Sequence, residues 1–171
     1  MKNKTTISVL IIVLAIAGLL WWGRSAQKSA SANPNQNSNL SANALQALET
    51  SYDFGKISMT QGKVEKIFEV SNTASEDITL EKVTTSCMCT VAYLETAEGK
   101  EEKGPFGMIG HGGLVPKANE VIKPGESREV RVVFDPNAHG PAGIGAINRV
   151  VTLEDNLGRT LEFQIKAVVT P

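Results

Sequence analysis

The amino-acid sequence predicts an all-β fold, an antiparallel β-sandwich of about seven strands, for the C-terminal part of the chain. Three observations lead to this prediction. From residue 51 onward, short runs rich in β-forming residues alternate with turn sequences. These runs are too closely spaced for the intervening helices of a βαβ series. Hydrophobic residues make up 42% of the 171 residues, which is enough to build a core.

The predicted strands are separated by sequences typical of turns, such as residues 123–126 (Lys-Pro-Gly-Glu) and 155–158 (Asp-Asn-Leu-Gly). In the last run, every second residue from Leu161 to Val169 is apolar. A period of two places these side chains on one face of a sheet. The predicted strands cover Tyr52–Gly55, Val64–Asn72, Ile78–Thr85, Cys89–Leu94, Arg128–Phe134, Arg149–Leu153 and Leu161–Val169.

A hydrophobic segment precedes this domain. Residues 5–23 are uncharged over 19 positions, and as a helix they would reach about 28 Å, close to the hydrocarbon thickness of a bilayer. Trp21 and Trp22 stand at its end, where indole rings favour the membrane interface. Lys2 and Lys4 favour a cytoplasmic N-terminus. We therefore expect a single N-terminal hydrophobic helix that binds the lipid bilayer through residues 5–23 and holds the C-terminal domain outside the cytoplasm, in the periplasm or at the cell surface.

A cleaved signal peptide is the alternative interpretation of the same segment. Ala30-Ser31-Ala32 has the small-residue form of a cleavage site, but it lies beyond Arg24 and Lys28, a long and charged approach. Both interpretations place the domain outside the cytoplasm. No cysteine follows the apolar stretch closely, so a lipoprotein anchor is not expected.

Composition divides the chain into three predicted parts. Residues 1–24 form the membrane anchor or signal peptide, residues 25–49 form a flexible linker, and residues 50–171 form the β-sandwich domain. The linker is rich in Ser, Ala, Asn and Gln, so it cannot bury a core. Within it, residues 42–49 are compatible with a short helical turn.

Charge and motifs argue against several classes of function. Residues 1–28 hold four basic side chains and no acidic one, so the rest of the chain, with 13 basic and 18 acidic side chains, carries a net charge of −5. A mildly acidic domain without a basic patch is a poor nucleic-acid binder. The sequence contains no phosphate-binding loop, dinucleotide fingerprint, HExxH or nucleophile-elbow motif. We therefore expect no enzymatic activity, no catalytic residue, no nucleic-acid partner and no small-molecule substrate.

Two glycine-rich stretches interrupt the strand pattern. The first, Gly104–Val115, holds five glycines and one proline, and the second, His139–Gly145, reads HGPAGIG. Glycine-rich loops of this kind in a compact domain are often functional. We expect them to contact an unidentified protein partner, since sandwich domains commonly bind through loops at their ends.

Five motifs follow one another between residues 52 and 136. They are Tyr52-Asp53-Phe54-Gly55-Lys56-Ile57, Phe68-Glu69-Val70-Ser71-Asn72-Thr73, Thr85-Ser86-Cys87-Met88-Cys89-Thr90, Lys123-Pro124-Gly125-Glu126-Ser127 and Val133-Phe134-Asp135-Pro136. In this order they resemble the DUF1573 family of bacterial domains of unknown function, over about residues 50–170. The resemblance implies an immunoglobulin-like sandwich, similar to ASH and major-sperm-protein domains, without an established activity. This chain departs from the family pattern in having Met88 where a glycine usually separates the two cysteines, and in its insertion at 104–115.

Cys87 and Cys89 are the residues best suited to form a site. On a strand, residues i and i+2 point to one face with Cα atoms about 6.6 Å apart, so a disulfide would need a bent backbone. Two thiolates on one face suit a soft ion such as Cu(I), with Met108 and His111 as candidate further ligands. The alternatives are cysteines that pack in the core, or a disulfide formed in an oxidising compartment. We interpret His139 as a loop residue.

The sequence thus favours a non-enzymatic, membrane-anchored extracytoplasmic module, interacting or structural, whose protein partner is unknown. No cofactor is expected for such a module. The alternative is a soft-metal (copper-type) binding or thiol-redox protein that uses the Cys-x-Cys pair. That alternative implies Cu(I) or another soft metal as the bound ion.

Overall fold

The structure, a computed structural model, describes residues 44–97, 99, 101–110 and 116–171. The predicted membrane segment at residues 5–23, the linker up to residue 43 and His111 lie outside the described residues. Among the residues that are described, no helix is long and apolar enough to cross a membrane.

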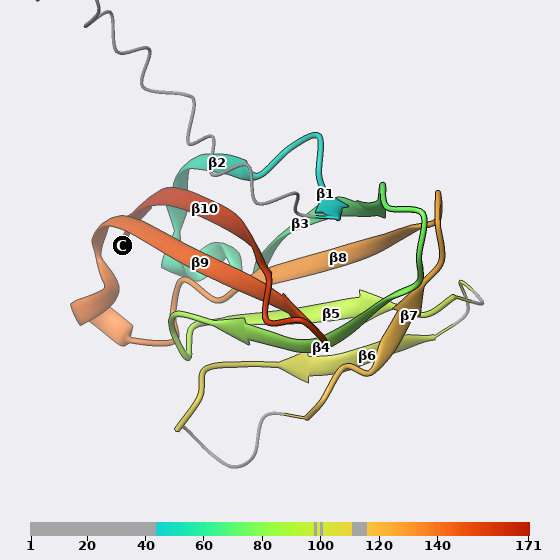
Figure 1. Ribbon diagram of the computed structural model, residues 1–171. Coiled ribbons are helices and arrows are strands. Elements are labelled where there is room, and N and C mark those ends of the chain that lie inside the picture. Colours follow the sequence, from blue (N-terminus) through green and yellow to red (C-terminus); the bar gives the residue numbers. More distant parts are fainter. Residues whose placement is uncertain (1–43, 98, 100, 111–115) are drawn as a thin grey trace, which may run out of the picture. The chain divides into compact units, whose positions relative to one another are not determined.

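The described part is all-β, as predicted, and consists of two five-stranded sheets (Figure 1). The first sheet has the order β1-β3-β8-β5-β6, and the second has the order β2-β10-β9-β4-β7. Two short 3-10 helices, η1 (Met59–Gln61) and η2 (Gly140–Gly143), lie between strands. The strands are β1 (Leu45–Gln46), β2 (Ser51–Ser58), β3 (Val64–Asn72), β4 (Ile78–Thr85), β5 (Thr90–Glu95), β6 (Glu102–Phe106), β7 (Glu120–Ile122), β8 (Ser127–Phe134), β9 (Gly145–Asp155) and β10 (Thr160–Thr170).

The core lies between the two sheets and follows the alternation seen in the sequence. In β10, Phe163, Ile165, Ala167 and Val169 are buried, while the residues between them are more exposed. The ring of Phe163 stacks on that of Phe68 in β3, with centroids 4.5 Å apart and an interplanar angle of 10°. Because β3 and β10 belong to different sheets, this stack joins the two layers.

The second sheet differs from the prediction of a purely antiparallel sandwich. β2 pairs in parallel with β10, with Tyr52 opposite Ile165, whereas the other strand pairs are antiparallel. β2 occupies an edge of the sheet, beside the last strand of the chain. A period-two pattern shows which face of a strand is buried but carries no information on the direction of its neighbour.

Three strands were not predicted. β6 falls partly in the first glycine-rich stretch, where Phe106 is buried and Ala92 of β5 pairs with it. Gly104 lies in this strand at a φ of +137°, and a Cβ there would stand 2.9 Å from the carbonyl oxygen of Ala92, so glycine permits the close approach. β7 is only three residues long, too short for a periodic signal.

The third unpredicted strand, β1, lies in the segment for which the sequence suggested linker with a short helical turn. Leu45 pairs with Asn72 of β3, and the Leu45 side chain is buried. The backbone N–H of Thr73 donates to the carbonyl of Ala44 over 2.8 Å. The apolar residues around it, Ala44, Ala47 and Leu48, do not alternate with a period of two, so the burial of Leu45 depends on a distant strand rather than on a local pattern.

Candidate functional site

The two cysteines lie in the connection between β4 and β5, which is held by hydrogen bonds at both ends. The Thr90 N–H donates to the Cys87 carbonyl over 3.1 Å, which closes a turn. Thr85 Oγ1 lies 3.1 Å from that same carbonyl oxygen and 2.9 Å from the carbonyl oxygen of Thr90. Ser86 and Val150 of β9 exchange two hydrogen bonds of 2.9 Å, through the Ser86 N–H and the Ser86 hydroxyl. The turn therefore has a defined position on the sandwich.

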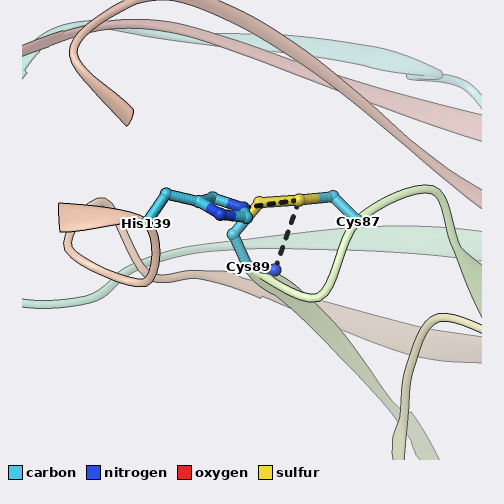
Figure 2. A group of neighbouring side chains, drawn as sticks. All are labelled: Cys87, Cys89 and His139. Carbon is cyan, nitrogen blue, oxygen red and sulfur yellow. Dashed lines mark hydrogen bonds between the residues drawn. A yellow bond between two sulfur atoms is a disulfide. The ribbon is translucent and has the colours of Figure 1, made fainter. Parts of the chain in front are cut away.

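Cys87 and Cys89 form a disulfide in this turn (Figure 2). Their Cα atoms are 5.3 Å apart, closer than the roughly 6.6 Å of an extended strand. The predicted strand began at Cys89, but β5 begins at Thr90, and the bend between the two cysteines brings the sulfurs together. Of the alternatives left open by the sequence, the structure thus has the disulfide.

His139 contacts the cysteine pair from a different connection of the chain. Its Nε2 lies 3.2 Å from Cys87 Sγ, and one ligand atom from each of the three residues lies within 4.8 Å of the others. His139 stands immediately before η2, in the loop that leaves β8. The Asp135 N–H donates to the Cys89 carbonyl over 2.9 Å, which ties the start of this loop to the cysteine turn. Figure 2 shows the imidazole and both sulfurs converging from two separate connections.

A cationic side chain contacts the second sulfur. Arg149 Nε in β9 donates to Cys89 Sγ over 3.2 Å, and its Nη1 donates to the carbonyl of Asn148 over 3.0 Å. The Cys89 N–H donates to Cys87 Sγ over 3.3 Å. Each sulfur therefore has a nitrogen neighbour able to donate a hydrogen bond. Such neighbours stabilise a thiolate more than a thiol.

The first glycine-rich loop passes the C-terminal end of β4, where the cysteine turn begins. The Thr85 N–H donates to the Gly107 carbonyl over 3.2 Å, so the residue before Met108 lies beside the cysteine turn. Met108 itself is partly buried. Its role as a ligand stays a prediction, as does that of His111, which lies outside the described residues. The sequence placed the ligands in this loop, whereas the structure brings His139 of the second loop to the sulfurs.

Exposed apolar side chains come from all three segments next to the disulfide. Met88 lies between the two cysteines, Ile144 ends the loop that His139 begins, and Ile109 follows Gly107 by two positions. Each is a large hydrophobic residue in contact with solvent. Because they lie on segments that adjoin the disulfide, these three side chains are candidates for contact with a partner.

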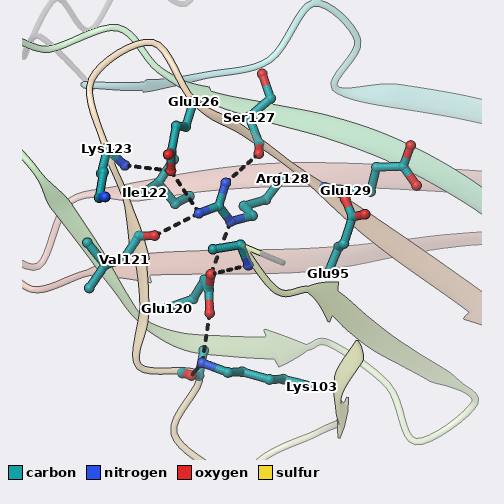
Figure 3. Close-up of polar contacts among 12 residues, drawn as sticks. Glu95, Lys103, Glu120, Val121, Ile122, Lys123, Glu126, Ser127, Arg128 and Glu129 are labelled. Carbon is teal, nitrogen blue, oxygen red and sulfur yellow. Dashed lines mark hydrogen bonds and ion pairs between the residues drawn. The ribbon is translucent and has the colours of Figure 1, made fainter. Parts of the chain in front are cut away.

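A second polar cluster lies beside the first half of β4, whereas the cysteines follow the last residue of that strand. Glu120 in β7 accepts hydrogen bonds from Arg128 of β8 and from Lys103 of β6, at 3.0 and 2.8 Å (Figure 3). Arg128 also contacts Glu126 over 2.9 Å. Every member is paired, and no buried side-chain nitrogen or oxygen among the described residues lacks a partner. The cluster joins strands of the two sheets, so we assign it a structural role.

Comparison with known proteins supports the fold. No curated protein matches the chain. A protein of unknown function from Porphyromonas gingivalis W83 superimposes with a TM-score of 0.52 at 18% identity, over 73% of this chain and 46% of that one. The VesB protease of Vibrio cholerae superimposes with a TM-score of 0.50 at 16% identity, over 74% of this chain and 32% of that one.

The chain thus spans less than half the length of either of these two structures. Identities this low show a shared fold and carry no activity from one protein to another. The sequence itself gives the closer assignment, because residues 45–105 match the model of a family described as "Protein of unknown function (DUF1573)". The resemblance to the DUF1573 family predicted from the sequence is thus confirmed over residues 45–105.

Proposed function

We propose that the chain is a membrane-tethered, extracytoplasmic module with an immunoglobulin-like sandwich, whose Cys87–Cys89 pair exchanges between disulfide and dithiol with a protein partner. One observation supports this above the others: both sulfurs of a surface turn have a hydrogen-bonding nitrogen beside them, His139 at Cys87 and Arg149 at Cys89. Hydrogen-bond donors at these positions stabilise the thiolates that form when the disulfide opens. The sequence predicted an interaction module with an unidentified protein partner. We infer that this partner is a protein that carries two thiols.

The two sulfurs have different roles in the exchange. Cys89 is buried, whereas Cys87 is only partly so. A partner thiolate attacks Cys87 Sγ, a mixed disulfide forms, and the electron pair of the broken S–S bond leaves on Cys89 as a thiolate. Arg149 donates a hydrogen bond to that thiolate and so makes Cys89 the better leaving group.

The second half of the exchange releases the partner. The remaining partner thiolate attacks the partner's own sulfur in the mixed disulfide, and Cys87 leaves as a thiolate beside His139. The partner departs with a disulfide, and the two electrons of its dithiol stay on Cys87 and Cys89. The exposed Met88, Ile109 and Ile144 would contact the partner while the mixed disulfide exists.

Replacing Arg149 with glutamine is expected to slow reduction of the full-length chain by a small dithiol reagent by at least about tenfold, because a hydrogen bond to a charged group contributes about 1.5–3 kcal/mol. Stopped alkylation followed by mass measurement gives the rate. Lys166→Gln is the matched control, since it removes an exposed cation from the neighbouring strand. Equal rates for Arg149→Gln and the wild type, or a disulfide that is reduced only when the domain unfolds, would contradict the proposal.

The location of the domain is tested separately. A reporter fused to the C-terminus is expected to be active outside the cytoplasm, and the mass of the full chain is expected to be retained, because residues 5–23 are uncharged and flanked by basic residues. A reporter active only in the cytoplasm would overturn this assignment. A mature chain that begins at Asn33 would instead support a cleaved signal peptide.

A further inference from the structure

We propose that Cys87, Cys89 and His139, once the disulfide is reduced, bind a single Cu(I) ion. This inference rests on the proposed function, because only the reduced pair offers two thiolates. It also changes the ligand set expected from the sequence. His139 takes the place predicted for Met108 and His111.

The three ligand atoms are arranged for a trigonal site. Metal–sulfur bonds of about 2.3 Å and metal–nitrogen bonds of about 2.0 Å require ligand atoms about 4 Å apart in a three-coordinate plane. Cys87 Sγ and His139 Nε2 are already 3.2 Å apart, and all three atoms lie within 4.8 Å of one another. Reduction breaks the S–S bond and lets the two sulfurs move apart. Rotations of the cysteine side chains can then place both sulfurs and the imidazole nitrogen around one ion.

The backbone around the ligands is held in place. The cysteine turn is tied to β9 through Ser86 and Val150, and the loop that carries His139 is tied to it through Asp135 and Cys89. Ligands fixed by the fold lose little conformational entropy when an ion binds. Side chains from two connections, far apart in sequence, therefore meet at a site that the sandwich has already formed.

Charge and ligand chemistry favour Cu(I) over a divalent ion. Thiolates are soft ligands that select Cu(I), and an imidazole suits it as a third ligand. Two thiolates and one Cu(I) leave a net charge of −1, which the Arg149 guanidinium beside Cys89 balances. Zn²⁺ would instead leave the cation of Arg149 unbalanced. Structural Zn²⁺ also takes four ligands, and this group, among the described residues, has three.

Copper binding and disulfide formation would exclude each other, since both use the same two sulfurs. The reduced, copper-bound protein would not be reoxidised by a partner disulfide until the ion leaves. The oxidised protein would not take up copper at all. The redox state of the Cys87–Cys89 pair would therefore decide whether the module holds the metal.

The test uses the full-length chain in detergent, reduced and kept without oxygen. Cu(I) is supplied as its complex with the chromophoric chelator bicinchoninate, whose colour reports how much copper the protein removes. We expect about one copper per reduced chain and none for the oxidised chain. Cys87→Ser and Cys89→Ser should abolish uptake, and His139→Ala should weaken it by at least about tenfold. X-ray absorption should report two sulfur neighbours and one nitrogen.

Matched variants keep the outcome decisive. His139 is exposed, so His139→Ala leaves the core intact and tests the site even if a cysteine variant folds poorly. Met108→Leu and His111→Ala should leave copper uptake unchanged. Normal uptake by His139→Ala, loss of uptake in Met108→Leu or His111→Ala, or preferential binding of Zn²⁺ would each overturn the site as assigned.

The two proposals fail in different ways. A chain that is reduced and reoxidised with the expected dependence on Arg149, yet removes no copper from bicinchoninate, would retain the thiol-exchange function and contradict the copper site. A disulfide that cannot be reduced in the folded chain would contradict both. Copper uptake by the reduced chain, together with equal reduction rates for Arg149→Gln and the wild type, would support the copper site and contradict the thiol-exchange function.

Discussion

Replacing Phe163 with alanine is expected to lower the free energy of unfolding by about 3–5 kcal/mol, enough to remove a large part of the stability of a domain of this size. The Phe163 side chain is 0% exposed and stacks on Phe68, with ring centroids 4.5 Å apart. Alanine would leave a cavity between the sheets, because the strands on either side cannot close it. Urea unfolding of residues 41–171, followed by circular dichroism, measures the loss.

Neighbouring positions provide the controls. Val168 lies on the same strand with its side chain in solvent, so Val168→Ala should change the stability little. Phe68→Ala should cost about as much as Phe163→Ala, and the double variant should cost less than the sum because the two rings share one contact. A Phe163→Ala variant as stable as Val168→Ala would mean that the ring does not lie in the core.

The alternation of apolar residues made the burial of β10 predictable, since a period of two is a local property of the chain. The central strands β3, β4 and β8 were predictable for the same reason, because β-forming apolar residues alternate with polar ones between turn sequences. β6 and β7 were not, because each is short and is stabilised by its neighbours in the sheet. The parallel pairing of β2 was also not predictable from the sequence, since strand direction depends on the path of the whole chain.

The site shows the same division between local and distant information. Cys87 and Cys89 are neighbours in sequence, so their pairing as a candidate site needed no knowledge of the fold. The proximity of His139 and Arg149 to the cysteines, in contrast, depends on which strands pair and in which register. Thr90, which begins β5, pairs with Phe134, which ends β8, so the loop after β8 meets the turn before β5. That pairing brings His139 to the cysteines, and a sequence-based assignment of β5 beside β8 would have found it.

Replacing Glu120 with alanine is expected to lower the free energy of unfolding by about 3 kcal/mol. Only 7% of the Glu120 side chain is exposed, and Oε1 accepts from Arg128 Nε at 3.0 Å and from the Ala97 N–H at 2.9 Å. Lys103 Nζ contacts Oε2 at 2.8 Å. Alanine would leave the buried Arg128 with one carboxylate fewer. The loss lies at the lower end of the range for buried ion pairs because Lys103 is partly exposed.

The same carboxylate links stability to pH. Burial is the largest single influence and raises the pKa of Glu120. The hydrogen bonds from Lys103, Arg128 and the Ala97 N–H, with the charge of Lys103, together outweigh burial, so the pKa lies below the ordinary 4.5. Since the pKa is lower in the folded chain, this stabilisation is fully present above pH 4.5 and is lost as the pH falls through the folded-state value. Glu120→Gln should therefore lose less stability on acidification than the wild type.

Glu126 provides the control for both measurements. It contacts the same Arg128 over 2.9 Å, but its side chain is far more exposed than that of Glu120. Solvent screens such a pair, so Glu126→Gln should reduce the stability much less than Glu120→Ala. Equal losses would mean that the cluster acts as a surface ion-pair network. A large loss confined to Glu120 would show that this carboxylate joins β7 of one sheet to β6 and β8 of the other, because Glu120 contacts both of those strands.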